Sequence, residues 1–173
     1  MPPPRTLMYE ELVEAFITDT LDPDQYPPEK LTLDLKETIS HNPSCTMVVG
    51  PRGMTLAHVA AQHGLIEVTE HLIKHKIPVL SDDYGAQPWH TAAEYGNIAA
   101  IEAYYNAWHD IMGHFGTIDW TILHLAALFN QCEVLEWVLG TGADVDVLDK
   151  SNRTPLFVAI QYKRKEAATL LCR

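Results

Sequence analysis

Cysteine is scarce in this sequence, with three residues among 173, namely Cys45, Cys132 and Cys172. An odd number of cysteines without metal-ligand spacing speaks against a disulfide framework and predicts a reducing compartment. No apolar run reaches the roughly 18 residues that a transmembrane helix needs, and the N-terminus lacks the apolar core of a signal peptide. The sequence also has no glycine-rich phosphate loop and no nucleophile elbow. We therefore expect no membrane association, no cofactor and no catalytic residues in this segment.

Basic residues are also few, because 12 Lys and Arg stand against 23 Asp and Glu, for a formal net charge of −11. This balance argues against nucleic-acid binding, which usually requires a basic patch, and against an anionic membrane surface. Residues 77–149 contain eleven Asp and Glu and no Lys or Arg. The acidic block predicts attraction of a protein partner with a basic surface. The alternative is an acidic face that contacts only water.

One pattern recurs along the chain, at residues 53–64, 85–96 and 119–130 and, in a weaker form, at 152–163. The steps between equivalent positions are 32, 34 and 33 residues. Self-similarity at a period of this length is typical of a helical solenoid, in which each repeat contacts only its neighbours. A chain of this length and hydrophobic content fits one domain.

The recurring pattern resembles the opening of an ankyrin repeat, Gly-x-Thr-Pro-Leu-His-x-Ala-Ala-x-x-Gly. Thr154-Pro-Leu matches its centre, and residues 142–146 match the Gly-Ala-Asp-Val-Asn hairpin of that family. Leu56-Ala, Gln87-Pro-Trp and Phe157 depart from the pattern. The resemblance covers residues 50–173 and implies an all-α fold, an ankyrin-repeat helical solenoid with short hairpin loops.

The organisation predicted from these patterns has three parts. Residues 1–8 form a flexible lead, and residues 9–49 form an N-terminal helical capping unit with two helices, at 9–20 and 31–40. Four ankyrin-like repeats follow, at 50–81, 82–115, 116–148 and 149–173, with the least regular hairpin at 109–119. A separate adaptor-recruiting module is the alternative for residues 9–49. The last helix has no following polar cap, so we expect the chain to continue in a longer protein, unless residues 163–165 make the fourth repeat polar enough to end the stack.

The motif also predicts structural residues. Thr55, Thr121 and Thr154 are expected to cap the first helix of their repeats. The resemblance implies that His58, His90 and His124 bond backbone groups of the neighbouring turn. No metal site is expected: His71 and His75 lack further ligands, and the loose cluster of His109, Asp110 and His114 is expected to be an ordinary surface.

The resemblance places the two residues before each closing position on the concave face of the solenoid, together with the hairpin tips. Aromatic side chains there are typical of interaction hot spots, although local packing is the alternative. The expected partner-binding residues are Tyr84, Glu94, Tyr95, Trp120, Leu128, Phe129, Arg153 and Tyr162, with Asp82 and Asp83 as an acidic rim. The predicted function is protein–protein interaction by a cytoplasmic monomer. The alternative is the targeting domain of a longer enzyme, for example a bacterial effector secreted into a host cytosol.

Overall fold

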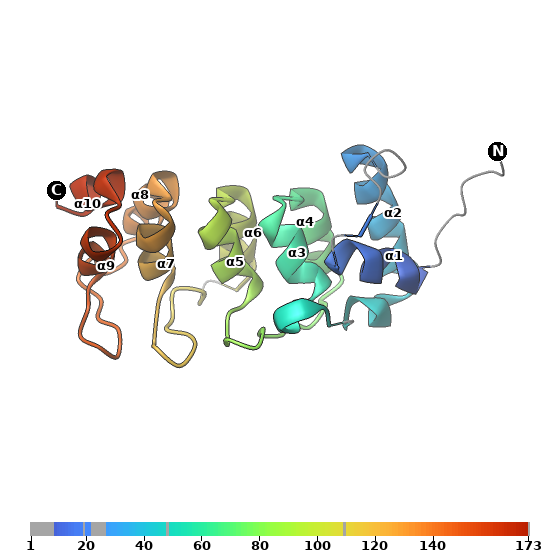
Figure 1. Cartoon of the computed structure of the whole chain (residues 1–173). Coiled ribbons are helices and arrows are strands. Elements are labelled where there is room, and N and C mark those ends of the chain that lie inside the picture. The colour runs from blue at the N-terminus through green and yellow to red at the C-terminus, as the bar shows by residue number, and fades with distance from the viewer. Residues whose placement is uncertain (1–8, 19, 22–26, 48, 109, 173) are drawn as a thin grey trace.

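The computed structural model describes residues 9–18, 20–21, 27–47, 49–108 and 110–172, so the predicted lead at 1–8 lies outside the described residues. The chain is helical (Figure 1), and its described part contains no strand, only an isolated antiparallel bridge between Phe115 and Trp120. The all-α prediction is confirmed. The α-helices are α1 (Tyr9–Ile17), α2 (Pro28–His41), α3 (Leu56–Gln62), α4 (Ile66–Lys74), α5 (Pro88–Tyr95), α6 (Ile98–Trp108), α7 (Ile122–Phe129), α8 (Cys132–Gly140), α9 (Pro155–Gln161) and α10 (Lys165–Leu171), with 3-10 turns η1 (Pro43–Met47) and η2 (Pro51–Gly53).

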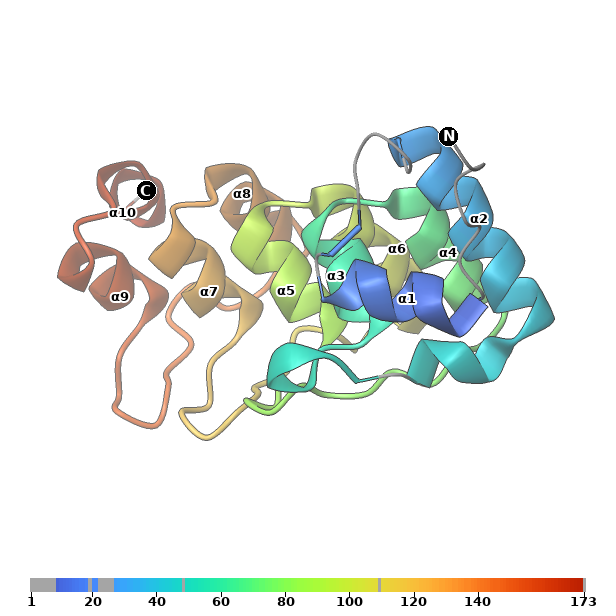
Figure 2. The same cartoon turned by 45° about the vertical axis from the view of Figure 1, so that its right-hand side comes forward.

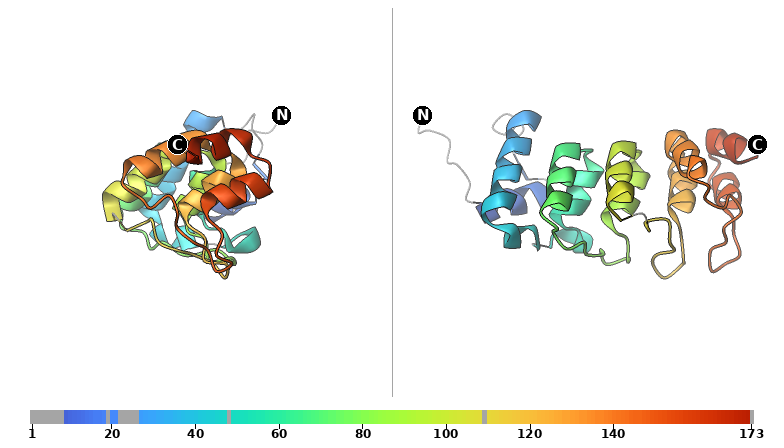
Figure 3. Two further views of the ribbon diagram at one scale, coloured as in Figure 1. Left: turned by 90° about the vertical axis from the view of Figure 1, so that its left-hand side faces the viewer. Right: turned by 180° about the vertical axis from the view of Figure 1, so that it is seen from behind.

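The helices stack in two layers. The inner helices α3, α5, α7 and α9 lie side by side, and the outer helices α4, α6, α8 and α10 lie behind them (Figure 2). Residues 75–87, 110–121 and 141–154 form loops that we call the second, third and fourth hairpins, after the repeats they precede. Viewed along the stack, the hairpins leave the helices on the same side (Figure 3, left). The inner helices and hairpins together form one long surface, which we call the inner face.

Close stacking depends on small side chains in the inner helices. The paired alanines of the motif are fully buried in the first three repeats, at positions 60–61, 92–93 and 126–127. An alanine pair lets the backbones of neighbouring inner helices approach closely, and each buried methyl contributes to the core. The outer helices supply bulk, with buried residues such as Ile101, Tyr104 and Leu135.

The N-terminal helices pack directly on the first repeat. Leu12, Val13 and Phe16 of α1 share one apolar cluster with Leu35 of α2 and Leu56 of α3. A capping unit requires such a contact, because the first repeat would otherwise expose its outward apolar surface. Two local expectations were incomplete. Pro28 starts α2, since proline fits the first helical position, and the 3-10 turns η1 and η2 were not predicted.

The four inner helices end in the same way. Gly64, Gly96, Asn130 and Lys163 take left-handed backbone conformations, with φ of 65°, 78°, 60° and 59°. This conformation reverses the chain into the outer helix, and Lys163 adopts it although a side chain at positive φ carries strain. No helix in the described part of the chain is long and apolar enough to cross a membrane.

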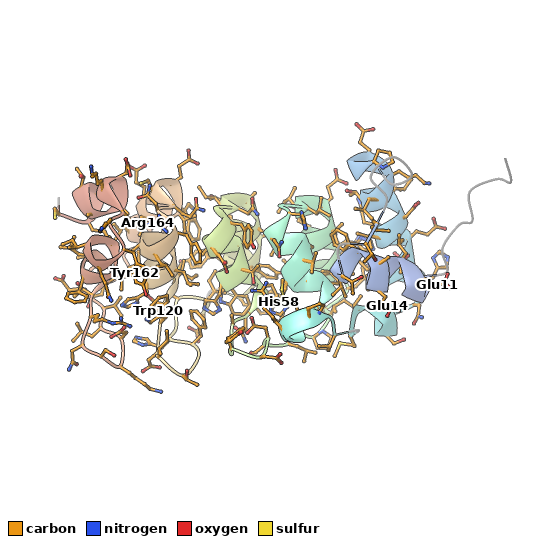
Figure 4. The ribbon with its side chains drawn as sticks, viewed as in Figure 1. Glu11, Glu14, His58, Trp120, Tyr162 and Arg164 are labelled. Atoms are coloured by element: carbon orange, nitrogen blue, oxygen red, sulfur yellow. The ribbon has the colours of Figure 1, made fainter. Side chains whose placement is uncertain are left out.

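Polar side chains just after these turns tie each repeat to the one before. Asn97 Nδ2 donates to the carbonyls of Ala61 and Gln62, at 2.7 and 2.8 Å. Gln131 Nε2 donates to Glu94 O at 2.8 Å, and Arg164, at the turn into α10 (Figure 4), donates to Leu128 O at 2.6 Å. Carbonyls at the end of each inner helix have no intrahelical partner, so these bonds satisfy them.

Candidate protein-binding face

Two of the motif histidines bridge successive repeats. His58 Nδ1 accepts from the Thr55 N–H at 3.1 Å, and its Nε2 lies 3.1 Å from Ala86 O in the second hairpin. His124 repeats this geometry, with Thr121 N–H at 3.3 Å and Arg153 O at 3.0 Å. Because Nδ1 accepts, the proton lies on Nε2 and is donated to the carbonyl. Burial, the largest cause, lowers the pKa of both imidazoles and keeps them neutral.

His90 breaks this regularity. Its Nδ1 accepts from the Gln87 N–H at 3.0 Å, but its Nε2 is buried without a hydrogen-bond partner. The equivalent carbonyl, that of Trp120, accepts only from the Phe115 N–H, at 2.8 Å, whereas the carbonyls of Ala86 and Arg153 each accept a backbone N–H and the imidazole together. The Phe115 ring stacks on the imidazole, with centroids 3.8 Å apart. Burial lowers the pKa of His90 to about 3. The irregular third hairpin therefore leaves one inter-repeat hydrogen bond unmade.

The predicted capping threonines lie at the helix starts. The hydroxyls of Thr55 and Thr121 lie 3.0 Å from Nδ1 of His58 and His124. Thr154 Oγ1 accepts from the Phe157 N–H at 3.2 Å, so the fourth repeat keeps its cap without a histidine. In the second repeat Gln87 occupies the capping position.

Four of the predicted anchors are exposed on the inner face. Tyr84, Tyr95, Phe129 and Tyr162 expose 65%, 45%, 38% and 45% of their surface. The first three line one pocket of about 220 Å³ between α5 and α7, together with Glu94 and Leu128. The remaining lining residues are Arg52, Met54, Asp82, Ala86, His90, Thr91, Phe115 and Leu125. The structure thus gathers six predicted binding residues at the junction of the second and third repeats, while Tyr162 lies beside α9 (Figure 4).

The expectation that Trp120 presents its ring at a hairpin tip is wrong. Trp120 is only 7% exposed, because it packs between the third and fourth repeats (Figure 4), where Nε1 donates to Asp149 Oδ2 at 3.1 Å. Its ring stacks on His124, with centroids 6.1 Å apart, and the guanidinium of Arg153 lies 5.9 Å from its centroid. Arg153, another predicted contact, is half-buried and forms an ion pair with Asp149 at 2.7 Å. Trp120 and Arg153 therefore stabilise the stack.

Aspartates brace two hairpins, a role that the sequence reasoning missed. Asp149 Oδ1 accepts from the backbone N–H groups of Ser151 and Arg153, at 2.8 and 2.9 Å. Asp82 Oδ1 accepts in the same way from Tyr84 and Ala86, at 2.9 and 2.8 Å. The two aspartates occupy equivalent positions in their repeats, and this recurrence was the sequence signal that could have indicated a shared structural role. Asp82 was predicted to be part of an exposed acidic rim, but it is half-buried and its carboxylate bonds the backbone of its own turn. Asp83 is exposed.

The environment of Asp149 decides its charge. Burial by itself would raise the pKa of this carboxyl, but hydrogen bonds from Arg153, Ser151 and Trp120 outweigh burial and hold the pKa well below its usual range. Asp149 is therefore ionised at neutral pH, and its charge is compensated by Arg153.

Elsewhere the histidines make ordinary contacts. His71 and His75 stack with ring centroids 4.4 Å apart, and His71 Nε2 lies 2.9 Å from Ser40 Oγ. His114 Nδ1 lies 3.0 Å from Asp119 O, while His109 lies outside the described residues. The described residues contain no group of three or more His, Cys, Asp or Glu that could hold a metal ion.

Comparison with known proteins gives a consistent result. Residues 105–173 match the family described as ankyrin repeats in three copies. The ankyrin repeat protein nuc-2 of Neurospora crassa is 29% identical over 115 residues, which is 66% of this chain and 11% of that protein. The probable 26S proteasome regulatory subunit p28 of Saccharomyces cerevisiae is 27% identical over 143 residues, 80% of this chain and 63% of that protein. The target of rapamycin complex 2 subunit AVO2 of the same yeast is 25% identical over 134 residues, 75% of this chain and 32% of that protein.

The chain spans less than two thirds of the length of each of these three relatives. Neither the family match nor the relatives support the alternative of a targeting domain of a secreted bacterial enzyme. The period, the stacked helix pairs, the left-handed closing residues and the bridging histidines agree with the family match. Residues 105–173 thus match the ankyrin-repeat family and the same stacked pattern precedes them, so the chain is an ankyrin-repeat solenoid; ankyrin repeats are non-catalytic modules of protein–protein interaction.

Proposed function

We propose that the chain binds its protein partner through the inner face, with Tyr84, Tyr95, Phe129 and Tyr162 as anchors. The observation that supports this proposal is the exposure of the four rings, in contrast to the buried side chains around them. Aromatic rings bury much area with few rotatable bonds, so a rigid stack that already presents them loses little entropy on binding.

The charge around these rings favours a partner with a basic surface. Asp83 is exposed beside Tyr84, and Glu94 is half-buried beside Tyr95. Residues 77–149 contain no Lys or Arg, so the second and third repeats carry only negative formal charge. Complementary charge increases the association rate of a basic partner and discriminates against acidic proteins.

We further propose that the chain acts as a monomer in the cytoplasm. Cys132 and Cys172 are free thiols, and Cys172 is exposed, which suits a reducing compartment. Sedimentation at several protein concentrations tests the monomer, and a concentration-dependent mass would contradict it.

The decisive experiment is affinity capture with the intact chain, followed by binding kinetics of the captured partner. The double variant Tyr95→Ala, Phe129→Ala should raise the dissociation rate and cost about 2 kcal/mol or more of binding free energy, as hot spots do. Leu33→Ala on α2 is the matched control, because Leu33 is an exposed apolar side chain away from the inner face. Unchanged binding by the double variant would refute the inner-face proposal.

A further inference from the structure

The pocket between α5 and α7 arises where the regular stacking is interrupted. In the first and third repeats the motif histidine bonds the next hairpin, but His90 makes no such bond. His90 is 3% exposed, lines the pocket, and keeps an unpartnered Nε2 there. The third hairpin instead places the Phe115 ring against the imidazole. The hollow lies at the junction of the second and third repeats, with Arg52 and Met54 of the first repeat also in its lining.

A carboxylate without a partner lies in this hollow. Glu94 is half-buried at the C-terminal end of α5, and its carboxylate oxygens make no hydrogen bond or ion pair with the described residues. Burial, the largest cause, raises the pKa of Glu94, while the nearby charge of Arg52 opposes this shift and Asp82 adds to it. Arg52 donates to Met54 Sδ at 3.2 Å and does not pair with Glu94. A partly desolvated carboxylate that no cation contacts directly favours a further cation.

We propose that this pocket receives one arginine side chain of the partner, an inference that rests on the proposed function. The guanidinium pairs with the Glu94 carboxylate and stacks against the rings of Tyr95 and Phe129. Small-molecule sites usually occupy about 300–1,000 Å³, so a pocket of about 220 Å³ suits a single side chain better than a whole ligand.

The lining favours arginine over lysine. A guanidinium is planar, stacks on aromatic faces and can bond a carboxylate through two parallel N–H groups, whereas an ammonium is compact and strongly hydrated. Cation–π attraction to the surrounding rings adds to the ion pair because the site is partly shielded from water. Arg52 at the edge repels an incoming cation, so Arg52→Ala should tighten arginine binding.

Short peptides test the proposal without knowledge of the partner. The blocked peptide acetyl-Gly-Arg-Gly-amide is titrated into the isotopically labelled chain at millimolar concentration, and the backbone amide spectrum is recorded. Its citrulline counterpart keeps the shape and the stacking but has no charge. We expect saturating shifts at Glu94, Tyr95 and Phe129 with the arginine peptide, and about tenfold weaker binding of the citrulline peptide, which corresponds to about 1.4 kcal/mol.

The variant Glu94→Gln should lose this preference for arginine, whereas Glu102→Gln on the outer helix α6 should keep it. Equal affinity for both peptides, or shifts confined to other regions, would overturn the proposal. If Glu94→Gln does not fold, the comparison of the two peptides on the unmodified chain still decides.

The captured partner separates this proposal from the broader one. If the double variant Tyr95→Ala, Phe129→Ala loses the partner and Glu94→Gln binds it normally, the inner face is the binding surface but the arginine pocket is wrong. If both variants bind normally, both proposals are wrong. Loss of binding in both, together with the arginine preference, supports the pocket.

Discussion

Replacing His124 by alanine removes the two backbone contacts that its imidazole makes between α7 and the fourth hairpin. The Thr121 N–H, at 3.3 Å, loses its partner, whereas the Arg153 carbonyl loses the imidazole at 3.0 Å but keeps its bond from the Asp149 N–H. Orphaning a buried polar group costs about 1–3 kcal/mol, and truncation also leaves a cavity in a fully buried site. We expect the free energy of unfolding to fall by about 3–5 kcal/mol.

His90→Ala provides the internal comparison. This variant also leaves a cavity, because His90 is 3% exposed, and it orphans the Gln87 N–H. It breaks no inter-repeat bond, and it removes an Nε2–H that is buried without a partner, which offsets part of the cavity cost. We expect a loss of about 1–3 kcal/mol, less than for His124→Ala. The assay is urea denaturation followed by circular dichroism, with an unchanged m-value as evidence that the variants change stability rather than the unfolded state. An equal or larger loss for His90→Ala would refute the reasoning, because the missing inter-repeat bond would then have no energetic consequence.

The remaining predictions concern pH, the fourth hairpin, the chain end and association. The pKa of His90 is about 3 in the folded chain against the ordinary 6.5 of a histidine, so between these pH values the unfolded chain binds a proton that the folded chain does not. The free energy of unfolding should therefore fall as pH drops below about 6.5, by up to about 1.4 kcal/mol per pH unit from this histidine. In urea denaturation across this pH range, His90→Leu should show a weaker dependence of the unfolding free energy on pH. Asp149→Ala leaves the Arg153 guanidinium and Trp120 Nε1 without their carboxylate, so unfolding free energy should drop by about 2–4 kcal/mol; a loss below about 0.5 kcal/mol in thermal or urea unfolding would contradict this. Hydrogen exchange should be faster in α10 than in α8, and equal protection would show that the fourth repeat is as stable as the third. Asp83→Lys should slow association of a basic partner several-fold, as high salt does, without lowering the melting temperature; an unchanged association rate in stopped-flow or biosensor kinetics would count against an acidic rim.

The sequence by itself determined the repeat architecture. The period of the motif, the paired alanines and the closing Gly or Asn residues are local signals, because every repeat must form the same helix pair before it can stack. Lys163 and Phe157 depart from the motif, yet the local structure at both positions is the one that the motif predicts. Lys163 adopts the left-handed backbone conformation, and the helix that contains Phe157 keeps its threonine cap. Packing against the neighbouring repeat overrides the weak local preference there.

The inner-face positions of Tyr84, Tyr95 and Phe129 could be predicted from the resemblance, since equivalent motif positions face the same way in each repeat. The role of Trp120 could not. It stands where a hairpin residue is often exposed. It is buried because two residues about one repeat later contact it: Asp149 accepts its N–H, and the guanidinium of Arg153 lies over its ring. Likewise, the carboxylate of Asp82, which was expected to be free, accepts hydrogen bonds from the backbone N–H groups of Tyr84 and Ala86 in its own turn.

Only the tertiary structure decided that the second junction differs from the others. His58, His90 and His124 occupy the same motif position, but the acceptor of each lies about 30 residues later in the next hairpin. In the third hairpin the Trp120 carbonyl bonds only the Phe115 N–H, and the Phe115 ring lies against the imidazole of His90, whereas the carbonyls of Ala86 and Arg153 each accept a backbone N–H and a histidine. Whether a buried donor finds its partner depends on how two distant segments meet in space, and repeat periodicity contains no information about that contact.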